Sequence, residues 1–384
     1  MKLFKLRRAK KEWRVASGEW QVSPLLLAAC VFATCILAAC TASPPADQPL
    51  FYLDHDADGV VQLYQIDADT IAPAQLTDGD ADVLHVAVSP DGAMAAYATT
   101  DAIWVMDAEG SGQTIVLDCL PDRCNQLVWH PDGRRLLYER AEQRDYNYFS
   151  FPRLFWLDTA TGDTIPLLEN ETRISQSAAF SPDGVWVAYV GSPDVGMQLF
   201  NLETGELRTV RTEISTAPVW SADSQMLYFR DRDVAILHEG EGDDEDHTSH
   251  DHSYVESVYL FSYALNSGVM VQLTDGIVDD GRPALSPDGE WIAFGRKPPR
   301  TNAGREIWLM RRDGSDLRQL TPTDPTVNYG GMRWGENGRF LLLQRYQIDT
   351  PSVPASLWLF DVETSDLSLL QSSGFLPVWA NFAQ

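Results

Sequence analysis

Leu285-Ser286-Pro287-Asp288-Gly289, followed by Phe294 at the fifth residue after the turn, is the clearest copy of the stretch that decides the fold. Related turns recur along the chain: Ser89-Pro90-Asp91-Gly92, His130-Pro131-Asp132-Gly133, Ser181-Pro182-Asp183-Gly184, Ser221-Ala222-Asp223-Ser224 and Gly335-Glu336-Asn337-Gly338. The last residues of successive turns are 41, 51, 40, 65 and 49 apart. A repeat of this length is typical of a propeller blade or of a helical array.

The residues around each turn favour strands over helices. Proline pre-sets φ at the first corner, aspartate bonds the following backbone, and glycine supplies the positive φ that closes a hairpin. The residue before each turn is apolar, and the fifth residue after it is aromatic or leucine. Further short β-branched and aromatic runs follow, such as Ile307-Trp308-Leu309-Met310 and Leu317-Arg318-Gln319-Leu320-Thr321. Each repeat therefore predicts four strands, and the chain an all-β propeller.

The two ends of this region predict one further blade. Residues 51–53, 61–67 and 74–77 look like strands two to four of a repeat that lacks its first strand. Pro377-Val378-Trp379 matches Pro218-Val219-Trp220, a first strand. We therefore predict seven four-stranded blades in a ring closed by N- and C-terminal strands, which removes exposed strand edges. Six blades with loose terminal strands are the alternative.

The Ser-Pro-Asp-Gly turns resemble the WD-like propeller repeats of the TolB family. Runs such as Gln272-Leu273-Thr274-Asp275-Gly276, leading to Arg282-Pro283-Ala284-Leu285, strengthen the resemblance. It covers roughly residues 50–384 and implies the propeller fold. Because such repeats also occur in peptidase propellers and in other exported proteins, the resemblance does not fix a function.

The first residues resemble a bacterial lipoprotein signal. A basic stretch precedes an apolar run that ends in Leu37-Ala38-Ala39-Cys40, and this run is shorter than the roughly 20 residues that span a bilayer. We predict a signal peptide over 1–39, lipidation of Cys40, a tether over 40–50 and the propeller over 51–384. The protein would then be exported and lipid-anchored to the cell membrane or to the periplasmic face of the envelope.

Charge and cysteine content narrow the partners and the compartment. The formal net charge of −26 argues against nucleic acid as a partner. Outside the signal and Cys40, the chain has only Cys119 and Cys124, which lie close enough in sequence for a local disulfide in an oxidising compartment. A free thiol pair or a metal site are the alternatives.

The long loops are predicted to lie on one face, opposite the Pro-Asp-Gly turns. Because loops on a rigid scaffold concentrate binding residues, this face is the candidate recognition surface. Its binding candidates are the aromatic residues of one insertion and the basic residues of another: Tyr146, Tyr148, Phe149, Phe151, Arg296, Lys297, Arg300 and Arg305.

Two stretches have metal-ligand composition. Residues 238–252 are rich in Asp, Glu and His, and imidazoles beside carboxylates suit zinc or another divalent transition metal. The candidate ligands are His238, His247, His250 and His252. Asp54, Asp56 and Asp58 resemble the start of a calcium loop, although Gln65 stands at the twelfth position, where a bidentate glutamate is expected. A solvated loop and an acidic turn are the respective alternatives.

Linear enzyme motifs are missing from the sequence. It has no Gly-x-Ser-x-Gly elbow, His-Glu-x-x-His helix or Gly-rich phosphate loop, and His85 and His130 are interpreted as structural. The leading interpretation is a monomeric binding or scaffold module, not an enzyme, for an envelope protein or glycan. The alternatives are a hydrolase or lyase with a central-channel site, because such a site assembles from distant blades, or metal capture through the His/Asp-rich loop.

Overall fold

A computed structural model describes residues 49–67, 72–146, 148–169, 174–192, 194–214, 216–235 and 255–380. The chain divides into two units, Met1–Cys40 and Thr41–Gln384, and all described residues belong to the second. The predicted signal peptide, Cys40, most of the predicted tether and the histidines of residues 238–252 therefore lie outside the described residues. The described residues contain no helix that is long and apolar enough to cross a membrane.

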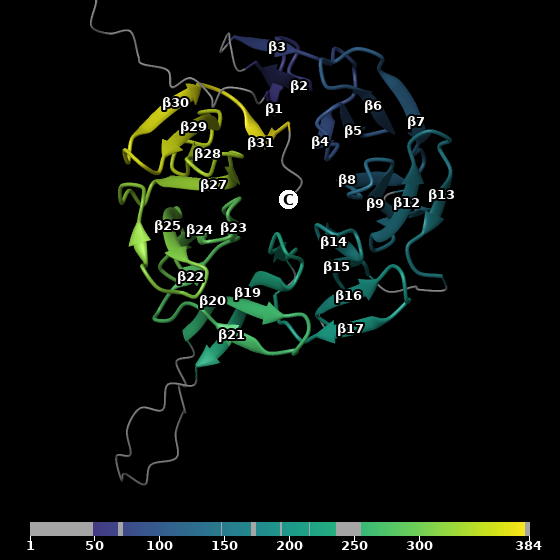
Figure 1. The fold of residues 1–384 in the computed structure, drawn as a ribbon. Helices are drawn as coiled ribbons and strands as arrows, with labels where there is room; N and C mark the ends of the chain where they lie inside the picture. Colours follow the sequence, from purple (N-terminus) through teal and green to yellow (C-terminus); the bar gives the residue numbers. More distant parts are fainter. Residues whose placement is uncertain are drawn as a thin grey trace, which may run out of the picture. The chain divides into compact units, whose positions relative to one another are not determined.

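The described residues form an all-β structure whose sheets follow one another around a common centre (Figure 1). Five sheets have four strands each, in the orders β3-β2-β1-β31, β4-β5-β6-β7, β13-β12-β9-β8, β14-β15-β16-β17 and β27-β28-β29-β30. Their strands are β1 (Leu50–His55), β2 (Val61–Ile66), β3 (Pro73–Gln75), β4 (Val83–Val88), β5 (Met94–Thr99), β6 (Ala102–Asp107), β7 (Thr114–Asp118), β8 (Arg123–Trp129), β9 (Arg135–Ala141), β12 (Arg153–Asp158), β13 (Thr164–Pro166), β14 (Gln176–Phe180), β15 (Trp186–Val190), β16 (Met197–Asn201), β17 (Leu207–Val210), β27 (Val327–Trp334), β28 (Phe340–Gln347), β29 (Ser356–Asp361), β30 (Leu367–Gln371) and β31 (Phe375–Trp379).

A sixth sheet has nine strands and departs from the predicted four-stranded blades. It contains β18 (Val219–Trp220), β19 (Met226–Ala235), β20 (Val255–Ala264), β21 (Met270–Gln272), β22 (Asp279–Asp280), β23 (Ala284–Leu285), β24 (Trp291–Lys297), β25 (Glu306–Arg311) and β26 (Arg318–Gln319). Two copies of the repeat are counted as one sheet because the long β20 reaches β22 through a parallel pairing of Val258 with Asp279. The prediction of seven separate four-stranded sheets is therefore wrong in this detail.

The two ends of the described chain meet in one sheet. β31 pairs antiparallel with β1, which places Trp379 opposite Leu50 and Val378 opposite Phe51. The pairing joins a C-terminal first strand to strands from the N-terminal end, as the repeat predicts.

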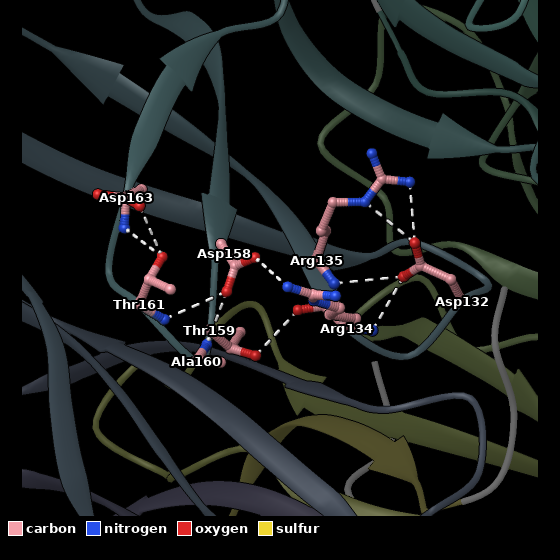
Figure 2. Close-up of polar contacts among 8 residues, drawn as sticks. All are labelled: Asp132, Arg134, Arg135, Asp158, Thr159, Ala160, Thr161 and Asp163. Carbon is pink, nitrogen blue, oxygen red and sulfur yellow. Dashed lines mark hydrogen bonds and ion pairs between the residues drawn. The ribbon is translucent and has the colours of Figure 1, made fainter.

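The turns hold the strands of each repeat in register through their aspartates (Figure 2). Asp132, between β8 and β9, accepts hydrogen bonds from the amides of Arg134 at 2.9 Å and Arg135 at 3.3 Å. Asp158, at the end of β12, accepts the amide of Ala160 at 3.0 Å, and Arg134 bridges the two turns by an ion pair with Asp158 at 3.2 Å. The carboxylates satisfy turn amides that the strand ladders leave unpaired.

Neighbouring sheets are joined by the apolar column that precedes each turn. Trp129 donates its Nε1–H to the carbonyl of Ala87 in β4 at 3.1 Å, and Trp334 donates to Ala284 in β23 at 3.0 Å. Both indoles are buried, so each fills the core between two sheets while its polar edge is satisfied. The aromatic columns are therefore core, as the repeat spacing predicts.

Candidate functional site

The predicted aromatic candidates lie on and beside a short hairpin of β10 (Gln143–Asp145) and β11 (Tyr148–Phe149). Tyr146, Tyr148 and Phe151 are 92%, 60% and 67% exposed. The ring of Phe149 is instead covered by the guanidinium of Arg123, which lies 3.9 Å from the ring centroid.

Three of the four basic candidates are neutralised within the protein. Arg296 binds Asp280 through two hydrogen bonds of 2.6 and 2.9 Å, and Arg305 binds Asp279 at 2.8 Å. Lys297 lies 3.9 Å from Asp279 and donates to the carbonyl of a loop residue. Sequence reasoning missed these pairings because Asp279 and Asp280 stand in β22, one hairpin before the basic residues. They meet the basic residues only because β22 pairs with β24 in the sheet.

Arg300, the fourth basic candidate, lines a cavity of about 360 Å³. The cavity lies where β19 and β20 meet β22 and the loop after β24, and it is lined by Glu213, Ile214, Arg230, Arg232, Val258, Asp279, Pro299 and Arg300. Asp231, which lies between the lining residues Arg230 and Arg232 in sequence, is buried. Its carboxylate accepts hydrogen bonds from the amides of Glu213 and Ile214 at 2.7 and 3.0 Å.

A backbone irregularity recurs on the strands nearest the centre, which include β4, β8, β14, β23, β27 and β31 (Figure 1). We call the third residue before the apolar column the bulge position, because the strand register shifts there in four of these strands. The residues at this position have positive φ: Gln126 at 52°, Ser177 at 53°, Gly331 at 58° and Leu376 at 48°. Such values are uncommon for residues other than glycine and often occur near functional sites.

Two of the bulge amides are bound by side chains of the preceding sheet. Glu139 Oε1 accepts the amide of Ser177 at 2.7 Å, and Gln344 Oε1 accepts the amide of Leu376 at 3.1 Å. Both acceptors follow the aromatic column directly, and we call this place the acceptor position. Its occupants along the six turn-containing repeats are Ala98, Glu139, Val190, Arg230, Gly295 and Gln344.

Arg230 is the cation among these six residues, and, unlike Glu139 and Gln344, its guanidinium has no acceptor to offer a bulge amide. Its Nε is buried without a hydrogen-bond partner. Burial lowers the pKa of Arg230, and the neighbouring Arg305 lowers it further, whereas Asp279 opposes the shift.

Glu139 is the described carboxylate whose pKa burial raises. One of its oxygens holds the Ser177 amide, and its position in β9 lies opposite Asn125 of β8. Sequence reasoning missed Glu139, although its signal was present: most of the acceptor positions carry small, apolar or neutral side chains.

His85 lies on β4, on the other side of β8. Its Nδ1 accepts the amide of Leu127 at 3.2 Å, so the neutral ring carries its proton on Nε2. Burial lowers the pKa of His85 to about 4, with a smaller contribution from Arg333. The imidazole is therefore neutral at physiological pH.

Arg333 also departs from the repeat. The corresponding residues directly before the apolar column are Ala87, Val128, Ala179, Val219, Ala284 and Val378. Burial lowers the pKa of Arg333, and Arg282 lowers it further. Within the described ranges, neither Arg282 nor Arg333 forms an ion pair with an acid, and Arg333 donates only to the carbonyl of Met332 at 2.8 Å. Cationic groups thus extend from the cavity of Arg230 toward His85.

A second cavity, of about 500 Å³, lies on the turn side between β8–β13 and β14–β17. His130 lines it and engages both ring nitrogens, Nε2 at 3.2 Å from the carbonyl of Gly184 and Nδ1 accepting the amide of Asp132 at 3.1 Å. Its ring packs edge-on against Phe180. His130 is held as a structural residue, as the sequence predicts.

The described residues contain no group of three or more His, Cys, Asp or Glu arranged to hold a metal ion. Of the predicted calcium ligands, Asp56 instead binds the amides of Asp58 and Val60, both at 2.9 Å, so it stabilises its own turn. Asp54 binds Ser373. Cys119 and Cys124 are joined by a disulfide with 5.9 Å between their Cα atoms.

No protein-family model matches the chain. A stretch of 209 residues is 28% identical to the uncharacterized peptidase YuxL of Bacillus subtilis, covering 47% of this chain and 31% of that protein. The chain spans less than a third of the length of the curated relatives it matches.

The solved structures that resemble the chain include a peptidase and a TolB protein. A puromycin-hydrolyzing peptidase of Mycobacterium tuberculosis has a TM-score of 0.63 and 15% identity, covering 88% of this chain and 54% of that one. TolB of Acinetobacter baumannii has a TM-score of 0.48 and 17% identity, covering 86% of this chain and 82% of that one. At 15% identity, the likeness to the peptidase structure concerns the fold alone.

The relatives overturn two of the expectations drawn from the sequence. The scaffold interpretation and the expectation that the chain is not an enzyme are wrong as leading interpretations, since the relative YuxL is named as a peptidase. The hydrolase alternative fits better. Sequence reasoning ranked it second because sites assembled from separate blades leave no linear motif.

Proposed function

We propose that this protein takes part in peptide hydrolysis and that its inner strands supply chemical groups to the reaction. The observation that carries this proposal is the sequence similarity to a peptidase over 209 residues. The inner strands β4 and β27, together with β9, add ionisable groups that a purely structural propeller does not need.

Glu139 is suited to activate water. Hydrolysis needs a base that takes a proton from water, and a carboxyl group whose pKa is raised toward the working pH is a better base than an ordinary one. Burial raises the pKa of Glu139, and its bond to Ser177 uses only Oε1. Oε2 then accepts the proton as the water oxygen bonds to the peptide carbonyl carbon, and that proton passes to the leaving amine as the C–N bond breaks.

His85 and Arg333 are suited to bind the oxyanion. The neutral His85 ring has a donor on Nε2 because Nδ1 is occupied by the Leu127 amide. Arg333 lies within electrostatic range of His85 and, among the described residues, donates to the carbonyl of Met332 and to no acid. Donors that are fixed before the reaction stabilise developing negative charge most effectively.

The same proposal includes seven blades in a closed ring. The nine-stranded sheet contains two copies of the repeat, β18–β21 and β22–β26, which one Val258–Asp279 pairing joins. The pairing of β31 with β1 supplies the seventh blade. We further propose that the turns are WD-type repeats and that Cys40 carries a lipid anchor that holds the propeller at the membrane of the envelope.

The test is hydrolysis of N-acetylated peptides by the full chain, followed by mass spectrometry. Glu139→Gln should lower the rate by about 10²- to 10⁴-fold, while the fold persists because Gln344 already makes the equivalent bond. Arg134→Gln on the turns of Figure 2 is the matched control and should keep the rate. Equal rates for Glu139→Gln and the wild type would refute the assigned role, and no hydrolysis by the wild type would refute the function.

A further inference from the structure

We infer that Arg230, Arg232 and Arg300 form a binding site for the carboxylate end of an extended peptide. The site is the cavity of about 360 Å³ where β19 and β20 meet the loop after β24. This inference depends on the proposed function only for the identity of the ligand as a peptide.

The departure of Arg230 from the repeat is the first argument. At two equivalent positions, Glu139 and Gln344 bind the bulge amide of the next sheet. Arg230 cannot accept that bond, and its own Nε is buried without a partner. A buried donor without an acceptor is unfavourable, and an oxygen of a bound ligand would satisfy it.

The charges around the cavity are the second argument. Three arginines line it, and Asp279, one of its two acids, is already bound by Arg305. Glu213, the other acid, is exposed at the edge. The local excess of positive charge contrasts with a net charge of −26 for the chain. An anion in the cavity would favour the charged form of Arg230 and so offset the desolvation and the repulsion that lower its pKa.

The backbone at Arg300 is the third argument. Its φ of 56° is in the left-handed region, which glycine adopts more easily than arginine. Arg300 has no ion pair among the described residues, although Arg296 and Arg305 on the same hairpin have acidic partners. The strained conformation therefore holds a guanidinium at the cavity with its donors available.

The geometry of the guanidinium favours a carboxylate. Arginine presents paired N–H donors that match both oxygens of a carboxylate. The cavity volume is within the range of small-ligand pockets. Arg282 lies within electrostatic range of both Arg230 and Arg333, so positive potential extends from the cavity toward His85. A peptide whose end is held in the cavity would have the rest of its chain drawn toward the inner strands.

The experiment measures binding, separately from hydrolysis. N-acetyl-tetra-alanine with a free C-terminal carboxylate is titrated into the full chain by calorimetry, alongside the same peptide with a C-terminal amide. The carboxylate form should bind at least about tenfold more tightly, and added salt should weaken it. Arg230→Gln and Arg300→Gly should each remove most of this difference, whereas Arg134→Gln should retain it.

The outcomes separate this inference from the proposed function. Equal affinity for the two peptides, or affinity unchanged in Arg300→Gly, overturns the inference even if hydrolysis occurs. Preferential binding of an acidic oligosaccharide such as tri-galacturonate overturns the peptide assignment. Carboxylate-dependent binding without hydrolysis supports the inference and refutes the proposed function. Because Arg300 is exposed and glycine fits its φ, the Arg300→Gly variant should fold even if Arg230→Gln does not.

Discussion

Two sheets carry different residues at the acceptor position of the repeat. They are the sheet of β8, β9, β12 and β13 and the nine-stranded sheet of β18–β26. In the first, Glu139 at the acceptor position binds the amide of Ser177 in the next sheet. In the second, Arg230 occupies that position, and its buried Nε lacks a partner. Glu139 thus satisfies a backbone amide of its neighbour. Arg230 instead leaves an unpaired donor beside a cavity.

The comparison teaches how a site is recognised in a repeat protein. A residue that differs from its equivalents and satisfies nothing in the fold is a better functional candidate than a residue that is merely polar and exposed.

Loss of a tryptophan from the regular part of the repeat should have the largest effect. Trp334 is 1% exposed and donates to the carbonyl of Ala284. Trp334→Ala should lower the free energy of unfolding by about 3–5 kcal/mol, measured by denaturant titration. A cost below about 1 kcal/mol would contradict the assignment of this column to the core.

His85 should make stability depend on pH. Its pKa is lowered to about 4 in the folded protein, whereas the unfolded chain has the ordinary value near 6.5. Between these values the unfolded state binds more protons, so the stabilising contribution is complete above pH 6.5 and is lost as the pH falls to about 4.

The wild type should therefore lose about 2–3 kcal/mol relative to His85→Gln over this interval, since one pKa unit is worth about 1.4 kcal/mol. Parallel pH profiles of unfolding for the two proteins would show that the ring is not held neutral. Histidine NMR titration gives an independent measurement of the same pKa.

An arginine in place of Gln344 at the acceptor position should create an unpaired cation like that of Arg230. Gln344→Arg removes the acceptor of the Leu376 amide and buries an unmatched cation. We expect a loss of about 1–3 kcal/mol in the free energy of unfolding. An unchanged stability would mean that the acceptor position tolerates arginine and that Arg230 is not exceptional.

Arg300→Gly should have the smallest effect on stability. Relief of the left-handed backbone is partly offset by the greater freedom of glycine in the unfolded chain. The variant should differ from the wild type by less than about 1 kcal/mol, in the stabilising direction. A clear loss of stability would show that Arg300 contributes to packing.

Much of the fold could be predicted from the sequence because short, local residue patterns specify the turns and strands of the repeat. The Pro-Asp-Gly turns and the column containing Trp129 and Trp334 give strand order and the core, and the match of residues 377–379 to a first strand predicts the pairing of β31 with β1. The joining of two repeats could not be predicted, because it depends on one tertiary contact between β20 and β22.

The candidate site was only partly accessible to sequence reasoning. Arg300 was identified, but the ion pairs of Arg296 and Arg305 with Asp280 and Asp279 depend on strand register. Arg230 and Glu139 could have been found by comparing the acceptor position across the repeats. The proposed hydrolytic role could not, because residues on separate blades form no linear motif.

The unfolding free energy of Arg230→Gln, measured together with its affinity for N-acetyl-tetra-alanine, tests the central claim most directly. The substitution removes a buried unpaired donor and supplies the acceptor found in Gln344. We expect a protein about 1 kcal/mol more stable than the wild type that binds the peptide about tenfold more weakly. A less stable protein that binds the peptide as well as the wild type would contradict it.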